Sequence, residues 1–338
     1  MRCGPRALVR RLIKDLAGKE AGWLKQLSQE ARLRLRYVKI PDRLPPFEWF
    51  PDFLIVGPQR TGTTWLHDHL RFHPQVLLSE PKELFFFSRI KEPTHPKFRS
   101  DSLAWYLERF RDSWPWWAYK TWFCLWHYGE LYRPVVRGEA TASYAALDED
   151  VIAEVVALHP QIKVILMVRD PIERAWSHAK KDLARNRGRK PSEVSEEEFA
   201  AFFRAPYQLR CARYVENIHR WARHVRPGHL FIGVFDDIAA HPEQLLLEVM
   251  RFLGVRADAK YIRRDVRSPV NPTGQSGVPA RYRRMLEDLL APEIAAIRTR
   301  LGWSWPLPPQ PTLRSFVFQP TSCEGAAAQS TVHSQTGG

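Results

Sequence analysis

Cysteine is scarce in this sequence, and long apolar runs are absent. The four cysteines, Cys3, Cys124, Cys211 and Cys323, lie far apart with no C-x-x-C pair. This spacing argues against a disulfide framework or a cysteine metal cluster and favours a reducing compartment. No apolar run approaches the roughly 20 residues that a membrane span needs, and the first residues lack the apolar region of a signal peptide. We therefore expect a cytoplasmic protein without a transmembrane segment.

Acidic residues are also in deficit. The chain has 37 Asp and Glu against 51 Lys and Arg, which leaves a net charge of +14. Such an excess favours an anionic partner, which could be a phosphorylated cofactor, a polyanionic glycan, nucleic acid or a membrane surface. Apolar residues make up 44% of the chain, enough for a sizeable core. The composition predicts a mostly globular protein with an anionic ligand.

Shifts in composition divide the chain into three parts. Residues 1–45 carry twelve Lys and Arg against four Asp and Glu, with apolar residues at helical spacing. This basic extension is either a membrane-surface anchor, with peripheral contact through residues 1–40, or a helix docked on the core, which we favour. Residues 46–304 are predicted to form the main domain. Residues 305–338, rich in Pro, Ser and Gly, are predicted to form a tail that is disordered at its end.

Strands alternate with helices along the main domain. Strands are predicted at 52–57, 75–78, 134–138, 162–168 and 230–235. Helices are predicted at 63–72, 148–158, from 170 onward, and at 196–205, 208–225, 242–253 and 279–301. The run 162–168 is almost continuously apolar, which is typical of a parallel strand covered on both faces. The predicted fold is α/β, a three-layer parallel sheet with helices on both faces.

A glycine loop stands between the first predicted strand and its helix, with the sequence Gly57-Pro-Gln-Arg-Thr-Gly62-Thr-Thr64. Glycines five residues apart let successive N–H groups and the helix N-terminus face one point, an arrangement that binds phosphate. The spacing is that of the nucleotide-kinase loop, but Thr63 occupies the lysine position. The cation of this loop is Arg60 instead.

The strand at 162–168 ends in Arg169 and Asp170. Asp170 followed by Pro171 is typical of a helix N-cap, whereas Arg169 lies beyond the strand end, where ligands gather. Kinase loops serve a Mg²⁺-bound triphosphate and need an acidic residue at a neighbouring strand end. Two cations without an evident metal carboxylate indicate a donor with two separate anionic groups, and we predict no metal.

These two motifs resemble those of sulfotransferases that use 3′-phosphoadenosine 5′-phosphosulfate (PAPS). Gly57 to Leu66 looks like their 5′-phosphosulfate loop, and Val168 to Ser177 looks like their 3′-phosphate motif. The resemblance covers roughly residues 50–300 and is greatest for the heparan-sulfate type and its soluble bacterial relatives. It implies a P-loop NTPase-like sulfotransferase fold. It also implies transfer of a sulfuryl group from PAPS to a hydroxyl or amine of a small molecule or glycan, by in-line displacement.

The resemblance also assigns the site residues. The 5′-phosphate would be held by the loop residues Gln59, Arg60, Thr61, Gly62, Thr63 and Thr64. The 3′-phosphate would be held by Arg169 and Ser177. The stretch 271–277 with Arg281 resembles a loop that closes on the nucleotide, and a basic helix face is an equal alternative. Arg60 stands where many of these enzymes have a catalytic lysine. An arginine keeps its proton near neutral pH, so its role would be electrostatic.

Glu83 matches the position of the family's general base, which takes the acceptor's proton. Glu80 and Glu139 are rival carboxylates. The sequence departs from the heparan-sulfate pattern at Ala140, where those enzymes carry lysine, and at Phe85, where some relatives carry histidine. Both departures argue against heparan sulfate as the acceptor.

Other features leave alternatives open. The aromatic belt at 105–128 could stack on sugar rings, but filling a core is commoner for such residues. His67, His69 and His73 do not align on one helix face, which argues against a metal site. Two rival functions are an ATP-dependent small-molecule kinase of the P-loop type and a non-enzymatic basic adaptor that binds polyanions. We expect PAPS and an acceptor as partners rather than nucleic acid.

Overall fold

A central sheet organises the computed structural model, which describes residues 34–268, 277–308 and 310–319. Six strands are ordered β2-β3-β1-β4-β5-β6. The first five along the chain are parallel, and β6 pairs with β5 in the antiparallel direction. The strands are β1 (Phe53–Val56), β2 (Val76–Leu78), β3 (Val136–Ala140), β4 (Lys163–Val168), β5 (Leu230–Val234) and β6 (Phe316–Val317).

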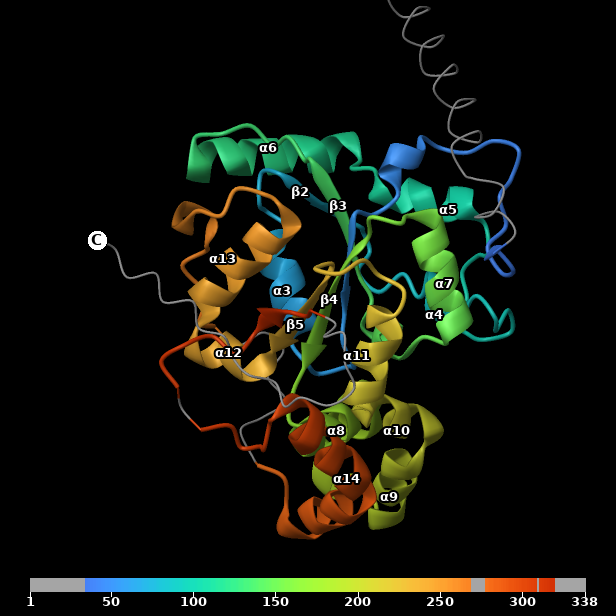
Figure 1. Ribbon diagram of the computed structural model, residues 1–338, viewed down its shortest axis with the longest axis vertical. Helices are drawn as coiled ribbons and strands as arrows, with labels where there is room; N and C mark the ends of the chain where they lie inside the picture. The colour runs from blue at the N-terminus through green and yellow to red at the C-terminus, as the bar shows by residue number, and fades with distance from the viewer. Residues whose placement is uncertain (1–33, 269–276, 309, 320–338) are drawn as a thin grey trace, which may run out of the picture.

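Helices cover both faces of this sheet (Figure 1). They are α3 (Thr63–Leu70), α4 (Phe86–Arg89), α5 (Leu103–Leu107), α6 (Trp114–Tyr128), α7 (Glu149–Leu158), α8 (Pro171–Ala179), α9 (Glu196–Arg204), α10 (Pro206–Ala212), α11 (Tyr214–Ala222), α12 (Phe235–Ala240), α13 (Pro242–Leu253) and α14 (Ala280–Leu301). The chain therefore has the predicted three-layer α/β fold.

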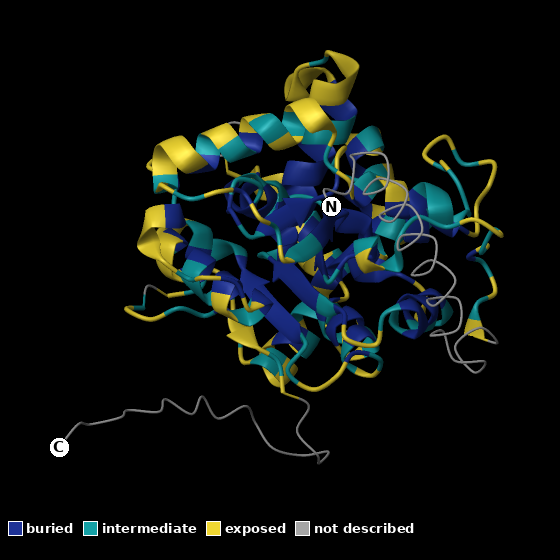
Figure 2. Ribbon diagram, turned by 90° about the horizontal axis from the view of Figure 1, so that it is seen from above, coloured by how far each residue is buried: buried dark blue, intermediate teal, exposed yellow. Residues whose placement is uncertain are grey.

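Alternate residues of each strand face opposite layers, as the two-residue period of a strand requires. Leu54 and Leu166 pack with α7 and α11 in one apolar cluster, whereas Ile55 and Met167 pack with α3 and α13 in another. Figure 2 shows the strands buried between helices whose outer faces are exposed. Burial on both faces explains why the strand sequences are almost continuously apolar.

Helices α4, α5 and α12 were not among the predicted elements, and three further elements differ from the predictions. The predicted helix 208–225 is two helices, α10 and α11, because Arg213 between them has a non-helical ψ of 60°. Helix α6 was not predicted, since its aromatic residues show no polar face. Strand β6 lies in the predicted tail and is only two residues long. It is held by Asp237, whose carboxylate accepts hydrogen bonds from the backbone N–H and the hydroxyl of Ser315.

The described residues before residue 46 pack on the main domain. Glu154 of α7 accepts hydrogen bonds from the backbone N–H groups of Tyr37, at 3.0 Å, and Val38, at 3.2 Å. Val38 is buried in the core. Residues 1–33 lie outside the described part of the chain, so the choice between a membrane anchor and a docked helix remains a prediction, as does the division at residue 45. Among the described residues, no helix is long and apolar enough to cross a bilayer.

Candidate active site

The predicted phosphate loop joins the carboxyl end of β1 to the amino end of α3. Gly57 has φ of +151° and Gly62, the N-cap of α3, has φ of +94°. A Cβ on Gly57 would lie 2.8 Å from the carbonyl oxygen of Met167, and one on Gly62 would collide with Ile238. Only glycine fits these two positions. The helix N-terminus therefore opens directly onto the loop, where its first N–H groups have no partner within the helix.

The loop threonines have different surroundings. Thr61 is fully buried, and its hydroxyl donates to the carbonyl oxygen of Pro58 at 2.8 Å. This bond braces the loop and directs the Thr61 side chain inward. Thr63 is buried in the first turn of α3, whereas Thr64 is half-buried. The two helix threonines are thus better placed than Thr61 to offer a hydroxyl to a ligand.

The two predicted phosphate motifs meet at this loop. Strands β1 and β4 are neighbours, so their carboxyl ends bring residues far apart in the sequence together. Arg60 Nε donates to Ser177 Oγ at 2.9 Å, and Arg169 Nη1 donates to the carbonyl oxygen of Arg60 at 3.2 Å. Arg60 adopts a left-handed conformation with φ of +77°, which is uncommon for a residue with a side chain.

The electrostatics of this cluster favour an anion. Burial lowers the pKa of the Arg60 guanidinium, and the charge of Arg169 lowers it further. Burial likewise lowers the pKa of Arg169. Lys180 and Lys181 follow α8, and their pKa values are lowered by burial and by the nearby arginines. A bound anion would relieve this repulsion between like charges.

Lys180 and Lys181 were missed by the sequence reasoning. They lie three and four residues beyond Ser177, the spacing that places side chains on one face of a continuing helix. Lys181 is within electrostatic reach of both Arg60 and Glu83. The helical spacing from Ser177 was the signal that could have identified them.

Glu83 lies in the turn after β2, beside the end of β3. Its carboxylate pairs with Lys82 Nζ at 3.0 Å and accepts from the backbone N–H of Ala142 at 3.3 Å. Its side chain is 26% exposed, so an acceptor can reach it. Glu83 and Phe85 both have positive φ, at 66° and 57°. Two such residues in one turn are a backbone strain of the kind found at functional sites.

The rival carboxylates have different surroundings, although Glu139 lies within electrostatic reach of Glu83. Glu139 is fully buried and accepts hydrogen bonds from Tyr106 at 2.5 Å and Thr141 at 2.6 Å. Burial raises its pKa to about 7. Glu80 is paired with Arg71 at 3.0 Å on an exposed part of the surface. Of the three carboxylates, Glu139 is enclosed and Glu80 is exposed, whereas Glu83 is partly buried and still accessible from solvent.

The raised pKa of Glu139 predicts a pH-dependent stability. A carboxyl with pKa 4.5 when unfolded and about 7 when folded binds more protons in the folded state between these values. The free energy of unfolding should therefore fall as pH rises through this window. Glu139→Gln should flatten the fall, as measured by urea unfolding at a series of pH values. Glu80→Gln is the control and should keep the slope, and an unchanged slope in Glu139→Gln would refute this assignment.

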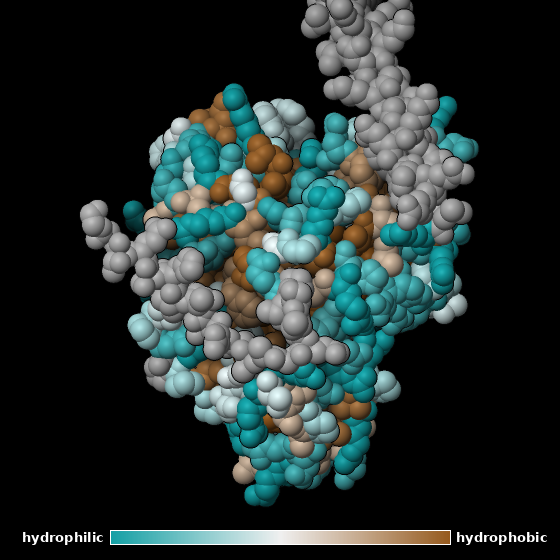
Figure 3. All heavy atoms as spheres, in the orientation of Figure 1, coloured by the Kyte–Doolittle hydropathy of each residue, from teal (hydrophilic) through white to brown (hydrophobic). Residues whose placement is uncertain are grey.

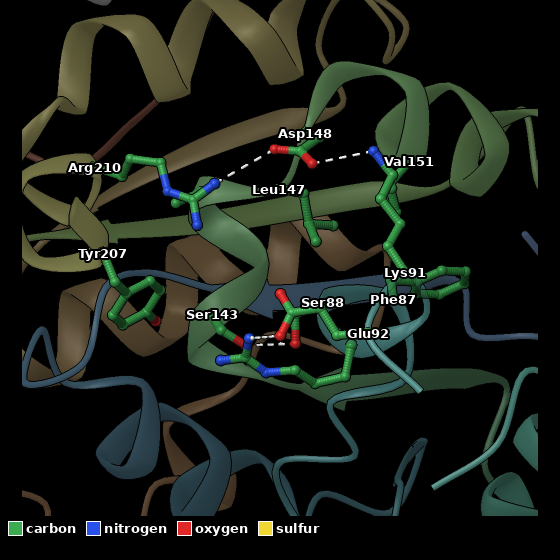
Figure 4. Close-up of a pocket in the computed structure, with 12 residues that line it drawn as sticks. Phe87, Ser88, Lys91, Glu92, Ser143, Leu147, Asp148, Val151, Tyr207 and Arg210 are labelled. Atoms are coloured by element: carbon green, nitrogen blue, oxygen red, sulfur yellow. Dashed lines mark hydrogen bonds and ion pairs between the residues drawn. The ribbon is translucent and has the colours of Figure 1, made fainter. Parts of the chain in front are cut away.

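A polar cleft with a cavity volume of about 50 Å³ lies between α4, the segment after β3 and α10 (Figure 4). Ser143, next to Ala142, donates to Ser88 at 2.8 Å across its floor. Tyr207 lines another side, and its hydroxyl donates to the side chain of Gln59 at 2.8 Å. Figure 4 shows Arg210 and Lys91 converging on Asp148 at the rim, at 3.4 and 3.0 Å. Glu83 and the phosphate loop do not line this cleft, but Ala142, which donates to Glu83, precedes Ser143, and Gln59 of the loop is bonded to Tyr207.

Arg281 lies farther out on the surface. It pairs with Glu196 of α9 at 3.2 Å. The next residue, Tyr282, stacks on Trp176 of α8 with ring centroids 5.0 Å apart, so the start of α14 does lie against the helix that carries Ser177. The stretch 271–277, except Gly277, lies outside the described residues.

The three histidines considered as a metal site each have a partner within the fold. His67 Nδ1 lies 3.1 Å from Asp68, His69 packs on Trp65, and His73 Nε2 lies 2.9 Å from the carbonyl oxygen of Arg256. Within the described ranges, no group of three or more His, Cys, Asp or Glu side chains is arranged to hold a metal ion.

Comparison with known proteins places these motifs in a family. The sulfotransferase domain model matches residues 50–269. The human bifunctional heparan sulfate N-deacetylase/N-sulfotransferase 2 is 26% identical over 232 residues, which cover 63% of this chain and 23% of that protein. The membrane-associated sulfotransferase kil1 of Dictyostelium discoideum is 24% identical over 155 residues, which cover 45% of this chain and 28% of that protein. The chain thus spans about a quarter of the length of these relatives.

A solved sulfotransferase from Alicyclobacillus acidocaldarius is also similar. It shares 22% identity and a TM-score of 0.48, over 73% of this chain and 94% of that one. The family model covers well over half of the chain, including both the loop at Gly57 and the strand-end Arg169. The protein therefore belongs to the sulfotransferase domain family.

Proposed function

We propose that the protein transfers a sulfuryl group from PAPS to a hydroxyl or amine acceptor, with Glu83 as the general base. The observation that carries this proposal is the convergence of Arg60, Arg169 and Ser177 at the carboxyl ends of β1 and β4. PAPS carries a 5′-phosphosulfate and a 3′-phosphate. The loop, with Arg169 before α8 and Ser177 in the last turn of that helix, offers cations and hydroxyls for both groups. The nearby Lys180 and Lys181 add to the positive field.

Each residue has a role in an in-line displacement. The amides of the loop from Gln59 to Thr64 hold the 5′-phosphate, with the hydroxyls of Thr63 and Thr64 assisting. Glu83 accepts the proton as the acceptor oxygen or nitrogen forms its bond to sulfur. The bond between sulfur and the bridging oxygen breaks, and its electron pair stays on the departing phosphate. Arg60 stabilises the charge that develops on that oxygen.

The polar cleft at Ser88, Ser143 and Tyr207 is the proposed acceptor site. Ser143 follows Ala142, whose backbone N–H donates to Glu83, and Tyr207 is bonded to Gln59 of the loop. Its hydroxyl lining and its rim of charged groups suit a polar acceptor such as a sugar. The heparan-sulfate relatives also favour a glycan. Heparan sulfate itself is less favoured, because Ala140 replaces the family lysine and Glu139 is buried.

The kinase alternative requires a metal carboxylate at the end of β4. Asp170 occupies that position, but its Oδ1 accepts from the backbone N–H groups of Ile172 at 2.8 Å and Glu173 at 3.3 Å. Asp170 thus caps α8, as its sequence context predicts. With Thr63 in place of the kinase lysine, neither feature favours Mg²⁺-bound ATP. A non-enzymatic adaptor would need no phosphate loop, so that alternative does not explain why Arg60 in the loop and Arg169 at the end of β4 lie together.

Transfer of label tests the proposed reaction. PAPS carrying radioactive sulfur is incubated with the protein and a panel of phenols, alcohols, amines and desulfated glycans, and ATP labelled on its γ-phosphate is incubated in parallel. We expect label from PAPS on at least one acceptor class, and transfer that persists with a chelator of divalent cations. Transfer from ATP alone would support the kinase, and binding of polyanions without any transfer would support the adaptor.

A further inference from the structure

Helix α6 has its polar and apolar residues reversed relative to an ordinary surface helix. Its one Lys or Arg, Lys120, is 1% exposed and pairs with Asp112 at 2.9 Å in the protein interior. Its large apolar residues instead face solvent, with exposures of 77% for Trp114 and 75% for Trp126. With their neighbours they form the surface that we call the aromatic surface: Trp114, Trp117, Tyr119, Trp122, Leu125 and Trp126.

The aromatic surface is continuous along the helix. Trp114, Trp122 and Trp126 are separated by eight and four residues and therefore share one side of α6. The rings of Tyr119, Trp122 and Trp126 follow one another at 6.1 and 6.3 Å with nearly parallel planes. Figure 3 shows brown residues interspersed with white and teal ones at the top of the molecule, where α6 lies in Figure 1. Contiguous apolar surface of this kind marks an interaction site in a soluble domain.

The aromatic surface is remote from the donor loop, so it does not serve the acceptor at that site. α6 packs on the turn before β2, with Phe123 against Phe72 at 4.5 Å. The amino end of β2 lies level with Val136 and the carboxyl end of β1 lies beyond Ala140. Five residues of strand separate them, about 17 Å along the sheet. In Figure 1, α6 lies at the top and α8, which carries Ser177, lies toward the bottom.

Arginine side chains flank helix α6, which carries the aromatic surface. Arg111 precedes α6 and Arg133 follows it, and both are exposed. At the far end, Arg256 and Lys260 pair with Glu130, and the exposed Asp258 lies between them in the sequence, so the charges there are balanced. Two copies of this surface would bring the flanking arginines together. An anionic surface would instead complement these arginines while the aromatic side chains leave water.

We propose that the aromatic surface docks on a lipid bilayer that contains anionic phospholipids. Tryptophan and tyrosine are the residues that concentrate at the headgroup level of membranes, because their rings are apolar and their N–H and O–H groups are polar. Lys and Arg beside them gain from the negative potential of the leaflet. Helix α6 would lie in the plane of the interface. The donor loop, at the opposite end of the strands, would face the aqueous phase.

Cosedimentation with vesicles tests this proposal. The full chain is mixed with vesicles of phosphatidylcholine alone, or with phosphatidylserine added, and the bound fraction is measured. We expect binding to the anionic vesicles that weakens with salt. The double substitution Trp122→Ser and Trp126→Ser should reduce the partition coefficient at least about tenfold, because each indole contributes buried apolar area. Phe316→Ser, at an exposed aromatic residue on β6, is the matched control and should bind as the unsubstituted chain does.

Two results would overturn the proposal. One is equal vesicle binding by the double variant and the unsubstituted chain, which would assign any membrane contact to another part of the protein. The other is an absence of vesicle binding together with a concentration-dependent dimer, seen by analytical ultracentrifugation, that the double substitution abolishes. Retained affinity for adenosine 3′,5′-bisphosphate in the double variant verifies that it is folded.

Discussion

Glu83→Gln should lower turnover at least about a hundredfold, because a positioned base contributes roughly 10²- to 10⁴-fold. Gln keeps the shape of the side chain but cannot take the acceptor's proton. The donor cluster of Arg60, Arg169 and Ser177 includes no carboxylate, so affinity for adenosine 3′,5′-bisphosphate should stay nearly constant. The measurement is the initial rate of sulfuryl transfer at saturating PAPS, with nucleotide affinity determined by calorimetry on the same preparation.

Glu80→Gln and Glu139→Gln are the controls for this variant. Glu80 is paired with Arg71 at the surface, and Glu139 is enclosed with Tyr106 and Thr141. Both variants should therefore retain most of the turnover at a temperature where they are folded. If Glu139→Gln abolished turnover while Glu83→Gln remained active, the base would be Glu139 and the assignment of Glu83 would be wrong.

Arg169→Ala should weaken binding of adenosine 3′,5′-bisphosphate by roughly ten- to a hundredfold. A hydrogen bond to a charged group contributes about 1.5 to 3 kcal/mol, and about 1.4 kcal/mol corresponds to a factor of ten in affinity. Adenosine 5′-phosphate lacks the 3′-phosphate, so its affinity should change much less. The ratio of the two losses, measured by calorimetry, reports whether Arg169 contacts the 3′-phosphate.

Arg281→Ala is a useful comparison for Arg169→Ala. Arg281 is paired with Glu196 on the surface, whereas the family resemblance assigns it to the nucleotide, with a basic helix face as an equal alternative. A loss of affinity confined to the bisphosphate would support that assignment, whereas unchanged affinity for both nucleotides would show that Arg281 is not part of the site. Equal losses for the two nucleotides in Arg169→Ala would show that Arg169 does not distinguish the 3′-phosphate.

The parts of the fold that sequence predicts well carry strong local signals. The buried strand β4 is a continuous apolar run, and Asp170 followed by Pro171 indicates the N-cap of α8. The loop follows from two glycines whose conformations exclude other residues. Each of these signals is contained in a few consecutive residues, so it can be recognised without knowledge of distant contacts.

The parts that sequence does not predict depend on distant contacts. Glu83 and Glu139 are both single acidic residues near apolar segments, and only the packing of Tyr106 over β3 shows that Glu139 is enclosed. Helix α6 resembles a core segment in composition, and only its position at the edge of the molecule shows that its aromatic residues are exposed. Strand β6 forms because Asp237, far away in the sequence, holds Ser315.

Calorimetric titration with adenosine 3′,5′-bisphosphate and with ATP, each with and without Mg²⁺, tests the donor site most directly. We predict that the bisphosphate binds without Mg²⁺ and that ATP binds poorly in either condition. The reason is that Arg60, Arg169 and Ser177 form a cluster without a metal carboxylate, suited to a ligand with two anionic groups, while Asp170 is engaged as a helix cap. Tight binding of ATP that depends on Mg²⁺, with weak binding of the bisphosphate, would contradict this prediction.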